Sequence, residues 1–154
     1  MFIKKIELTN EKDTENLSKK IGAFLQKKDF VALRGDLGAG KTSFSRSLIR
    51  HLGDDKQEVP SPTFTLVQFY DLPKFTLWHF DLYRIKHPEE IYELGWEDAC
   101  HDGVVLAEWP ENLGNLIPED RIEIELFFTG KDGERIATIK GLGEMEERLN
   151  GAGL

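Results

Sequence analysis

The pattern of apolar and polar residues along the first fifty positions predicts two strand-and-helix units. From Phe2 to Leu8 apolar residues alternate with polar ones, which is the period of a strand with one buried face. Between Leu17 and Leu25 apolar residues recur every three or four positions, the spacing of an amphipathic helix. An apolar run predicts a buried strand over 30–34, and helical spacing returns over 41–51.

The middle of the chain predicts a hairpin, a short helix and a central strand. Residues 65–70 and 76–83 are rich in β-branched and aromatic side chains, and the short segment between them suits a turn between antiparallel strands. Pro88 begins a short helix that ends at Gly95. The apolar run 104–107 is too short for a helix and predicts a strand buried on both faces.

A second hairpin completes the predicted domain. Residues 121–129 pair with 134–140 through a glycine-containing turn. The tail, 141–154, is polar, and we expect it to form a loosely attached helix that packs on the domain or trails from it. This order of elements predicts an α/β fold, a three-layer sandwich with a mixed sheet and antiparallel hairpins, as one domain over residues 1–140.

Composition favours a single cytoplasmic domain. The chain has 154 residues, of which 40% are hydrophobic, which suits one core. No apolar run reaches the ~20 residues of a membrane span, and the alternating start differs from the apolar block of a signal peptide. Cys100 is the only cysteine and lacks the spaced partners of a zinc site, so we interpret it as a small, partly buried side chain.

The net charge of −8 argues against a domain that binds nucleic acid through its own surface charge. The charge is uneven, because the first fifty residues are basic and the rest are acidic. Lysine pairs at 4–5, 19–20 and 27–28 give the first third a basic edge that could meet an acidic protein or RNA. A solvated helix face explains the same lysines more simply.

Residues 35–42 match the P-loop pattern, Gly-x-x-x-x-Gly-Lys-Thr, between a predicted strand and a predicted helix. Glycines let backbone N–H groups approach phosphate oxygens, and the start of the helix adds partial positive charge. The lysine reaches the β- and γ-phosphates and the threonine hydroxyl reaches Mg²⁺. We therefore predict a P-loop NTPase-like site for a nucleotide and magnesium, formed by Gly38, Ala39, Gly40, Lys41, Thr42 and Ser43. The alternative is a glycine-rich turn that binds nothing.

Glu108 is the first candidate for the carboxylate that phosphate chemistry also needs. Such a group holds Mg²⁺ or orients the attacking oxygen. Glu108 directly follows the apolar strand 104–107, at the edge where other P-loop proteins place an acid, and an acid there is otherwise costly. Trp109 precedes Pro110, so we expect an extended residue that is either fixed near the site or simply part of the core.

Asp81 is the second candidate carboxylate. On the strand 76–83 the side chains of His79, Asp81 and Tyr83 share one face. Asp81 could accept a proton from water, position the water or hold magnesium through water. Arg84 could pair with phosphate or with Asp81, and a plain ion pair at the strand end is the alternative. We assign His79 a supporting role as a hydrogen-bonded orienter.

The loop 60–65 reads Pro-Ser-Pro-Thr-Phe-Thr and is a candidate switch. Its two prolines stiffen the backbone, and the hydroxyls of Ser61 and Thr63 could approach a γ-phosphate. Prolines also simply lower the entropy of an unfolded loop. The residues alone leave both interpretations open.

Together these motifs resemble the TsaE family, the bacterial P-loop ATPases of tRNA threonylcarbamoyladenosine biosynthesis. The resemblance covers residues 1–140 and rests on the order and spacing of the segments 35–42, 61–67, 79–84, 88–95 and 108–111. It implies an ATPase that works with two partner proteins in placing threonylcarbamoyl on adenosine 37 of tRNAs that read codons beginning with A. By the same resemblance the protein resets or regulates the partner complex and does not itself transfer the group.

The resemblance also implies roles for single residues. Thr42 and Glu108 would bind Mg²⁺, and Asp81 would act near the γ-phosphate of ATP. The catalytic residues are then Lys41, Asp81 and Glu108, and which of the two acids orients the water stays open.

Further contacts of ATP follow from the same resemblance. The loop 61–65 would behave as a switch with Thr63 as its contact. The family holds the base with the start of its first helix and with its last hairpin, which implicates Glu11 and Arg135.

Two other function classes compete with an ATPase of this kind. A small-molecule kinase needs a lid and several arginines to clamp a second substrate. The arginines after the P-loop helix are scattered over strands and tail, which disfavours a kinase. A nucleotide-gated binding module with negligible hydrolysis would carry the same residues as a slow ATPase. We expect partner proteins, an indirect link to tRNA, and no membrane. The oligomeric state and direct contact with tRNA stay open.

Overall fold

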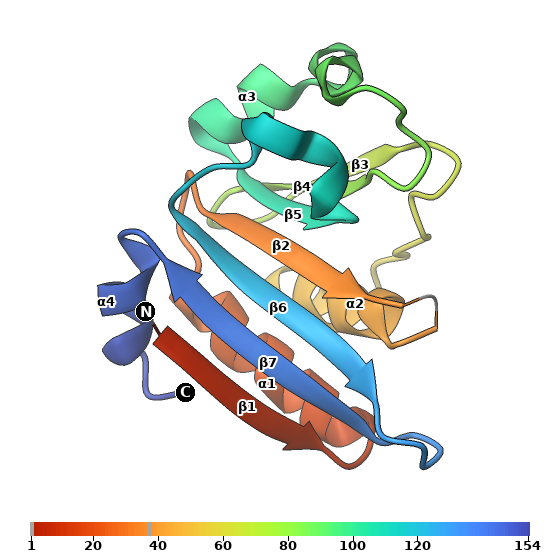
Figure 1. Cartoon of the computed structure of the whole chain (residues 1–154), viewed down its shortest axis with the longest axis vertical. Coiled ribbons are helices and arrows are strands. Elements are labelled where there is room, and N and C mark those ends of the chain that lie inside the picture. Colours follow the sequence, from red (N-terminus) through yellow and green to blue (C-terminus); the bar gives the residue numbers. More distant parts are fainter. Residues whose placement is uncertain (1, 37) are drawn as a thin grey trace.

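The computed structural model describes residues 2–36 and 38–154, and over this range a seven-stranded mixed sheet organises the chain (Figure 1). Met1 and Leu37, a variable position of the P-loop pattern, lie outside the described residues. The strands are β1 (Phe2–Leu8), β2 (Phe30–Gly35), β3 (Val67–Asp71), β4 (Thr76–Asp81), β5 (Val104–Glu108), β6 (Arg121–Phe128) and β7 (Arg135–Leu142). The helices are α1 (Glu11–Phe24), α2 (Lys41–Leu52), α3 (Trp96–Asp102) and α4 (Met145–Asn150), with the 3₁₀ helices η1 (Pro88–Leu94) and η2 (Pro110–Leu116).

The strand order, β1-β7-β6-β2-β5-β4-β3, confirms the predicted mixed sheet. The pairs β2–β5, β2–β6 and β4–β5 are parallel, so β2, β4, β5 and β6 all end at one edge. The two predicted hairpins, β3–β4 and β6–β7, are antiparallel, and β1 pairs with β7. Because β2 ends at that common carboxyl edge, the loop after β2 lies there as well.

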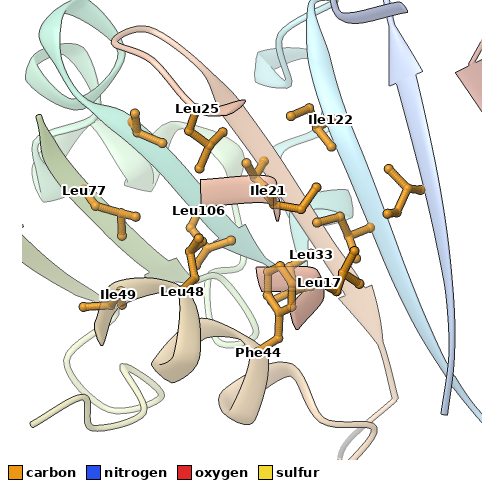
Figure 2. Packing of buried hydrophobic residues seen from close by; sticks show 14 of the residues in the cluster. Leu17, Ile21, Leu25, Leu33, Phe44, Leu48, Ile49, Leu77, Leu106 and Ile122 are labelled. Atoms are coloured by element: carbon orange, nitrogen blue, oxygen red, sulfur yellow. The ribbon is translucent and has the colours of Figure 1, made fainter. Parts of the chain in front are cut away.

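Apolar side chains on both faces of the central strands form the core. On one face α1 and α2 cover Leu33 of β2 and Leu106 of β5, with Ile21 and Phe44 among the helical side chains (Figure 2). On the other face η1, α3 and η2 cover a second cluster around Phe80. Strands buried on both faces are continuous apolar runs, which is why 104–107 indicated a central strand.

The tail packs on the domain, which is one of the two arrangements expected for it. Helix α4 packs Met145 and Leu149 into the core. Gly141 permits this close approach, since a Cβ there would lie 2.7 Å from Leu149 Cδ1. The guanidinium of Arg148 binds both carboxylate oxygens of buried Asp29, at 2.6 and 2.9 Å. The polar sequence of the tail conceals these contacts because only a few of its side chains face inward.

Helix α3 is an element that the apolar pattern does not indicate. The short helix expected from Pro88 is the 3₁₀ helix η1, and it ends at Gly95 as expected. A seven-residue helix then begins at once and buries Trp96 and Ala99. Within the described residues, no helix has the length and apolar character needed to cross a membrane.

Candidate nucleotide-binding site

A cavity of about 230 Å³ lies at the carboxyl edge of the sheet, beside the start of α2. Residues from the loop after β2, from the segment 61–63 and from the ends of β4 and β5 share it. Its lining residues are Gly38, Gly40, Lys41, Thr42, Ser43, Ser61, Thr63, Asp81, Glu108 and Trp109. The structure therefore brings together most of the site residues predicted from sequence, including both candidate acids.

The described part of the predicted P-loop has two positions with a backbone that favours glycine. Gly38 and Gly40 have φ angles of 81° and 102°, which disfavour any residue with a Cβ. Gly40 is the residue that precedes α2, and no side chain of residues 2–36 or 38–154 caps the helix there. The first-turn amides are therefore left for another acceptor. Ala39 differs from the expectation, because it is buried and its N–H donates to Asp36 O at 3.0 Å, so it shapes the loop and does not line the cavity.

Lys41 lies beside the cavity, almost fully buried. Its Nζ donates to the carbonyl of Gly35 at 2.6 Å and lies 3.9 Å from the centre of the Trp109 ring. Burial lowers the pKa of Lys41 from its ordinary value of 10.5, while the nearby carboxylates of Glu108 and Asp81 oppose that shift. A cation held by one carbonyl and one aromatic face is available to a more strongly negative group.

Trp109 is not extended as its position before proline predicts. Its φ and ψ angles are 57° and 49°, a left-handed conformation that is strained for a residue with a side chain. In this conformation the ring covers Lys41 and packs on Tyr83, with ring centres 5.0 Å apart. Tertiary contacts therefore override the local preference, and Trp109 forms part of the cavity wall.

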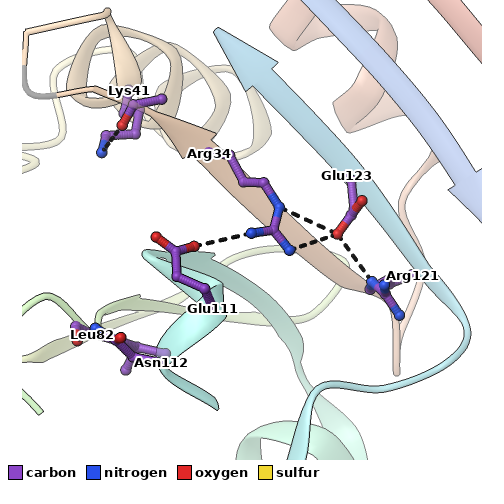
Figure 3. Close-up of polar contacts among 8 residues, drawn as sticks. Arg34, Lys41, Leu82, Glu111, Asn112, Arg121 and Glu123 are labelled. Atoms are coloured by element: carbon purple, nitrogen blue, oxygen red, sulfur yellow. Dashed lines mark hydrogen bonds and ion pairs between the residues drawn. The ribbon is translucent and has the colours of Figure 1, made fainter. Parts of the chain in front are cut away.

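The segment after Trp109 is anchored to the sheet on two sides (Figure 3). Arg34 of β2 forms two ion pairs. Its Nη1 lies 3.0 Å from Oε2 of Glu111, and its Nη2 lies 2.8 Å from Oε1 of Glu123 on β6. Burial opposes the ionisation of Glu123, but hydrogen bonds from Arg34 and Arg121 outweigh it and lower its pKa. On the other side, Asn112 Nδ2 donates to the carbonyl of Leu82 at 2.7 Å. These contacts fix η2 and, with it, the turn that carries Trp109.

Glu108 ends β5 as a buried carboxylate with one partner. Its Oε2 lies 2.6 Å from Nε2 of His79, and His79 is itself buried. The second carboxylate oxygen has no protein partner among the described residues, which leaves it for a ligand in the cavity. Nδ1 of His79 is buried and has no hydrogen-bond partner in the described part of the chain. His79 is hydrogen-bonded, as predicted, and its partner is Glu108.

Asp81 lies beside Glu108, because the two are register partners on adjacent parallel strands. Its Oδ2 accepts a hydrogen bond from Thr63 Oγ1 at 3.0 Å, and its Oδ1 accepts one from the Tyr83 N–H at 3.1 Å. The hydroxyls of Ser61 and Thr63 lie 2.7 Å apart. The loop 60–65 is thus tied to the candidate acid.

The alternative Asp81–Arg84 ion pair is not present among the described residues. The Arg84 guanidinium lies 4.8 Å over the ring of Phe64 instead. Phe64 is highly exposed, with 82% of its surface accessible.

Glu11 and Arg135, the two residues implicated in holding the base, do not line this cavity. Glu11 lies in a larger groove of about 830 Å³ between α1 and α2, and Ser43 lines both spaces, so the groove is adjacent to the cavity. Arg135 lies on the outer side of the loop, where it donates to the carbonyls of Gly38 and Ala39.

Several lining residues of the groove escaped sequence reasoning. Lys19, Arg46 and Arg50 lie along it with Glu11 and Glu15. The sequence does contain an indication of this face. Glu11, Glu15 and Lys19 recur every four residues on α1, and Arg46 and Arg50 do so on α2, so each set lies on one side of its helix.

The donor set suits magnesium bound together with phosphate. No group of three or more His, Cys, Asp or Glu side chains among the described residues could hold a metal by itself. Magnesium usually takes only one or two protein oxygens, with substrate phosphates and water completing its shell. Thr42 and Glu108, which line one cavity with uncapped helix amides, match that requirement.

Comparison with known proteins decides the family. The model of the family described as Threonylcarbamoyl adenosine biosynthesis protein TsaE matches residues 8–136. The chain belongs to the TsaE family. A relative from Rickettsia typhi, a tRNA threonylcarbamoyladenosine biosynthesis protein TsaE, is 44% identical over 133 residues, 86% of this chain and 92% of the relative. The TsaE of Bacillus subtilis is 36% identical over 141 residues, 91% of this chain and 87% of the relative.

A solved structure shares the fold of this chain. The crystal structure of Bacillus subtilis YdiB matches with a TM-score of 0.79 and 28% identity, over 98% of this chain and 94% of that one. The α/β fold predicted from the sequence is therefore confirmed, and it is a fold shared with that protein.

Proposed function

We propose that this TsaE-family chain is a Mg-dependent ATPase that supports formation of N6-threonylcarbamoyladenosine at position 37 of tRNA, in a complex with partner proteins. The pathway comes from the names of its relatives. The observation that carries the ATPase assignment is the meeting of Lys41, Thr42, Asp81 and Glu108 in one cavity at the start of α2. A cytoplasmic location remains a prediction from the sequence.

In this proposal the loop and the helix start hold the phosphates. The amides of the first turn of α2 have no side-chain cap and donate to phosphate oxygens. Lys41 exchanges its bond with the Gly35 carbonyl for a stronger one with the β- and γ-phosphates. The free oxygen of Glu108 and the hydroxyl of Thr42 would hold Mg²⁺. Magnesium supplies charge neutralisation of the transferring phosphoryl group.

Asp81 is the proposed positioning group for the attacking water. Its two oxygens accept hydrogen bonds from Thr63 and from the Tyr83 N–H, so its orientation is fixed before any ligand binds. A prepositioned carboxylate at the cavity wall can orient water or accept its proton. The Thr63–Asp81 bond also links the loop 60–65 to the chemistry, which supports the proposed switch.

Calorimetry with Mg-ATP tests the nucleotide site. Lys41→Ala removes the cation beside the cavity and should abolish tight binding while the circular dichroism spectrum stays native. Lys20→Ala, at an exposed position on α1, is the matched control and should bind like the native chain. Unchanged affinity in Lys41→Ala would remove the basis of the P-loop assignment.

A further inference from the structure

Arg135, the first residue of β7, braces the outer side of the phosphate loop. Its Nε donates to the carbonyl of Ala39 at 3.1 Å, and its Nη2 donates to the carbonyl of Gly38 at 3.2 Å. Its Nη1 donates to the carbonyl of Glu134 at 2.8 Å. All three of these hydrogen bonds end on backbone oxygens, so the planar fork of the guanidinium is committed to the backbone.

An aromatic ring holds the guanidinium in this place. Phe128, the register partner of Arg135 on β6, stacks under the guanidinium with its ring centre 4.5 Å from Cζ. A Cβ at Gly38 would lie 3.7 Å from the same ring. The loop, Arg135 and Phe128 therefore form one packed unit at the end of the last hairpin.

The hydrogen bonds from Arg135 also set the direction of the loop N–H groups, because of the geometry of the peptide bond. In a planar trans peptide the C=O and N–H groups point in opposite directions. The unit that joins Ala39 to Gly40 turns its oxygen to Arg135, which turns the Gly40 N–H the other way, and Gly40 lines the cavity. A cation on the carbonyl also polarises the peptide and strengthens its N–H as a donor.

We propose that Arg135 is a positioning residue for the phosphate-binding loop and not a contact of the base. Its side chain fixes two loop carbonyls and so prepares the loop for phosphate before a nucleotide arrives. Arg135 is also absent from the lining of the groove that contains Glu11. The inference rests on the proposed nucleotide site, and it concerns how the chain builds that site.

Inorganic triphosphate separates the two roles, because it has phosphates and no base. We would measure the Kd of Mg-ATP and of Mg-triphosphate by calorimetry for the native chain, Arg135→Gln, Arg135→Lys and Lys131→Gln. Lys131 is an exposed cation in the turn of the same hairpin, so Lys131→Gln matches the charge change without touching the loop. Denaturant unfolding of each variant confirms that it is folded.

If Arg135 positions the loop, its replacement should lower the affinity for both ligands equally. Removing two charge-assisted hydrogen bonds should weaken Mg-ATP and Mg-triphosphate by the same factor in Arg135→Gln, about tenfold or more. Arg135→Lys should recover only part of this loss, because an ammonium lacks the fork that reaches both carbonyls. In steady-state turnover KM should rise with kcat nearly unchanged, and Lys131→Gln should behave like the native chain.

Other outcomes would overturn the inference. Weaker Mg-ATP binding with unchanged Mg-triphosphate binding would make Arg135 a base contact. Full recovery in Arg135→Lys would make it a simple charge beside the phosphates. If the native chain bound neither ligand, the proposed function itself would fail, whereas native binding with unaffected Arg135 variants would contradict the brace alone.

Discussion

The Nε2 atom of His79 lies 2.6 Å from Oε2 of Glu108, and this pair joins the interior of β4 to the end of the adjacent parallel strand β5. Both side chains are buried, with 1% and 6% of their side-chain surface exposed. A buried carboxylate with one fixed oxygen and one free oxygen presents the free one in a defined direction. His79 thereby sets the orientation of the residue proposed to hold magnesium.

Replacing His79 should impair magnesium use more than phosphate binding. Loss of a partner that orients a metal ligand typically lowers metal affinity about tenfold to a hundredfold. We expect His79→Ala to raise the Mg²⁺ concentration needed for half-maximal ATP binding by that factor, and His79→Gln, which keeps a donor, to raise it less. Magnesium titrations followed by a fluorescent nucleotide measure this. An unchanged magnesium requirement in His79→Ala would show that Glu108 needs no orienter.

The Thr63–Asp81 hydrogen bond predicts a defect in partner communication. Thr63→Ala removes the link between the loop and the acid, so ATP-dependent association with the tRNA-modifying partner proteins should weaken more than ATP binding does. Thr65→Ala is the control, because its hydroxyl contacts Gln68 instead. Pull-down experiments with ATP and with ADP measure the association. Equal partner affinity of the native chain in both nucleotide states would remove support for a switch.

The ion pair between Arg148 and Asp29 predicts that the tail is needed for stability. Arg148→Ala leaves a buried carboxylate without its bidentate partner, which should lower the free energy of unfolding by about 2–4 kcal/mol. Glu147→Ala, at an exposed position on the same helix, should change it little. Urea denaturation compares them. Equal stability of Arg148→Ala and the native chain would mean that the ion pair does not stabilise the fold.

Cys100 should react with alkylating agents only at high pH. Burial disfavours the thiolate and raises the pKa of Cys100 from 9.0 to about 11. Because the folded pKa is raised, this thiol favours the folded state below pH 9.0, and that contribution is lost as the pH rises toward 11. Iodoacetamide modification followed by mass spectrometry should accelerate about tenfold for each pH unit above 8. Rapid modification of Cys100 at pH 7 would show that burial does not suppress its thiolate.

The sequence predicted the elements with strong periodicity and the chemistry at strand ends. The apolar run 104–107 indicated a central strand, which is β5. The glycine pattern 35–42 lies between a strand and a helix, β2 and α2, as predicted. Glu108 could be placed at the carboxyl edge because it directly follows that strand. Such predictions succeed where one local pattern determines the position of a residue.

The remaining features depend on contacts between distant segments. The left-handed Trp109 follows from packing on Lys41 and Tyr83, which the rule for residues before proline does not include. Arg84 lies over Phe64, and Asp81 instead accepts hydrogen bonds from Thr63 and Tyr83. The place of Arg135 on the loop carbonyls likewise depends on the pairing of β6 with β7.

Phosphate release from ATP, measured for the native chain and for Asp81→Ala with and without the partner proteins and tRNA, tests the central claim most directly. The account predicts slow release by the native chain alone and faster release with the partners. Asp81→Ala should bind Mg-ATP with near-native affinity and hydrolyse it at least ~100-fold more slowly, because it loses a group that acts mainly in the transition state. A native rate in Asp81→Ala, or no release by the native chain with its partners present, would contradict it.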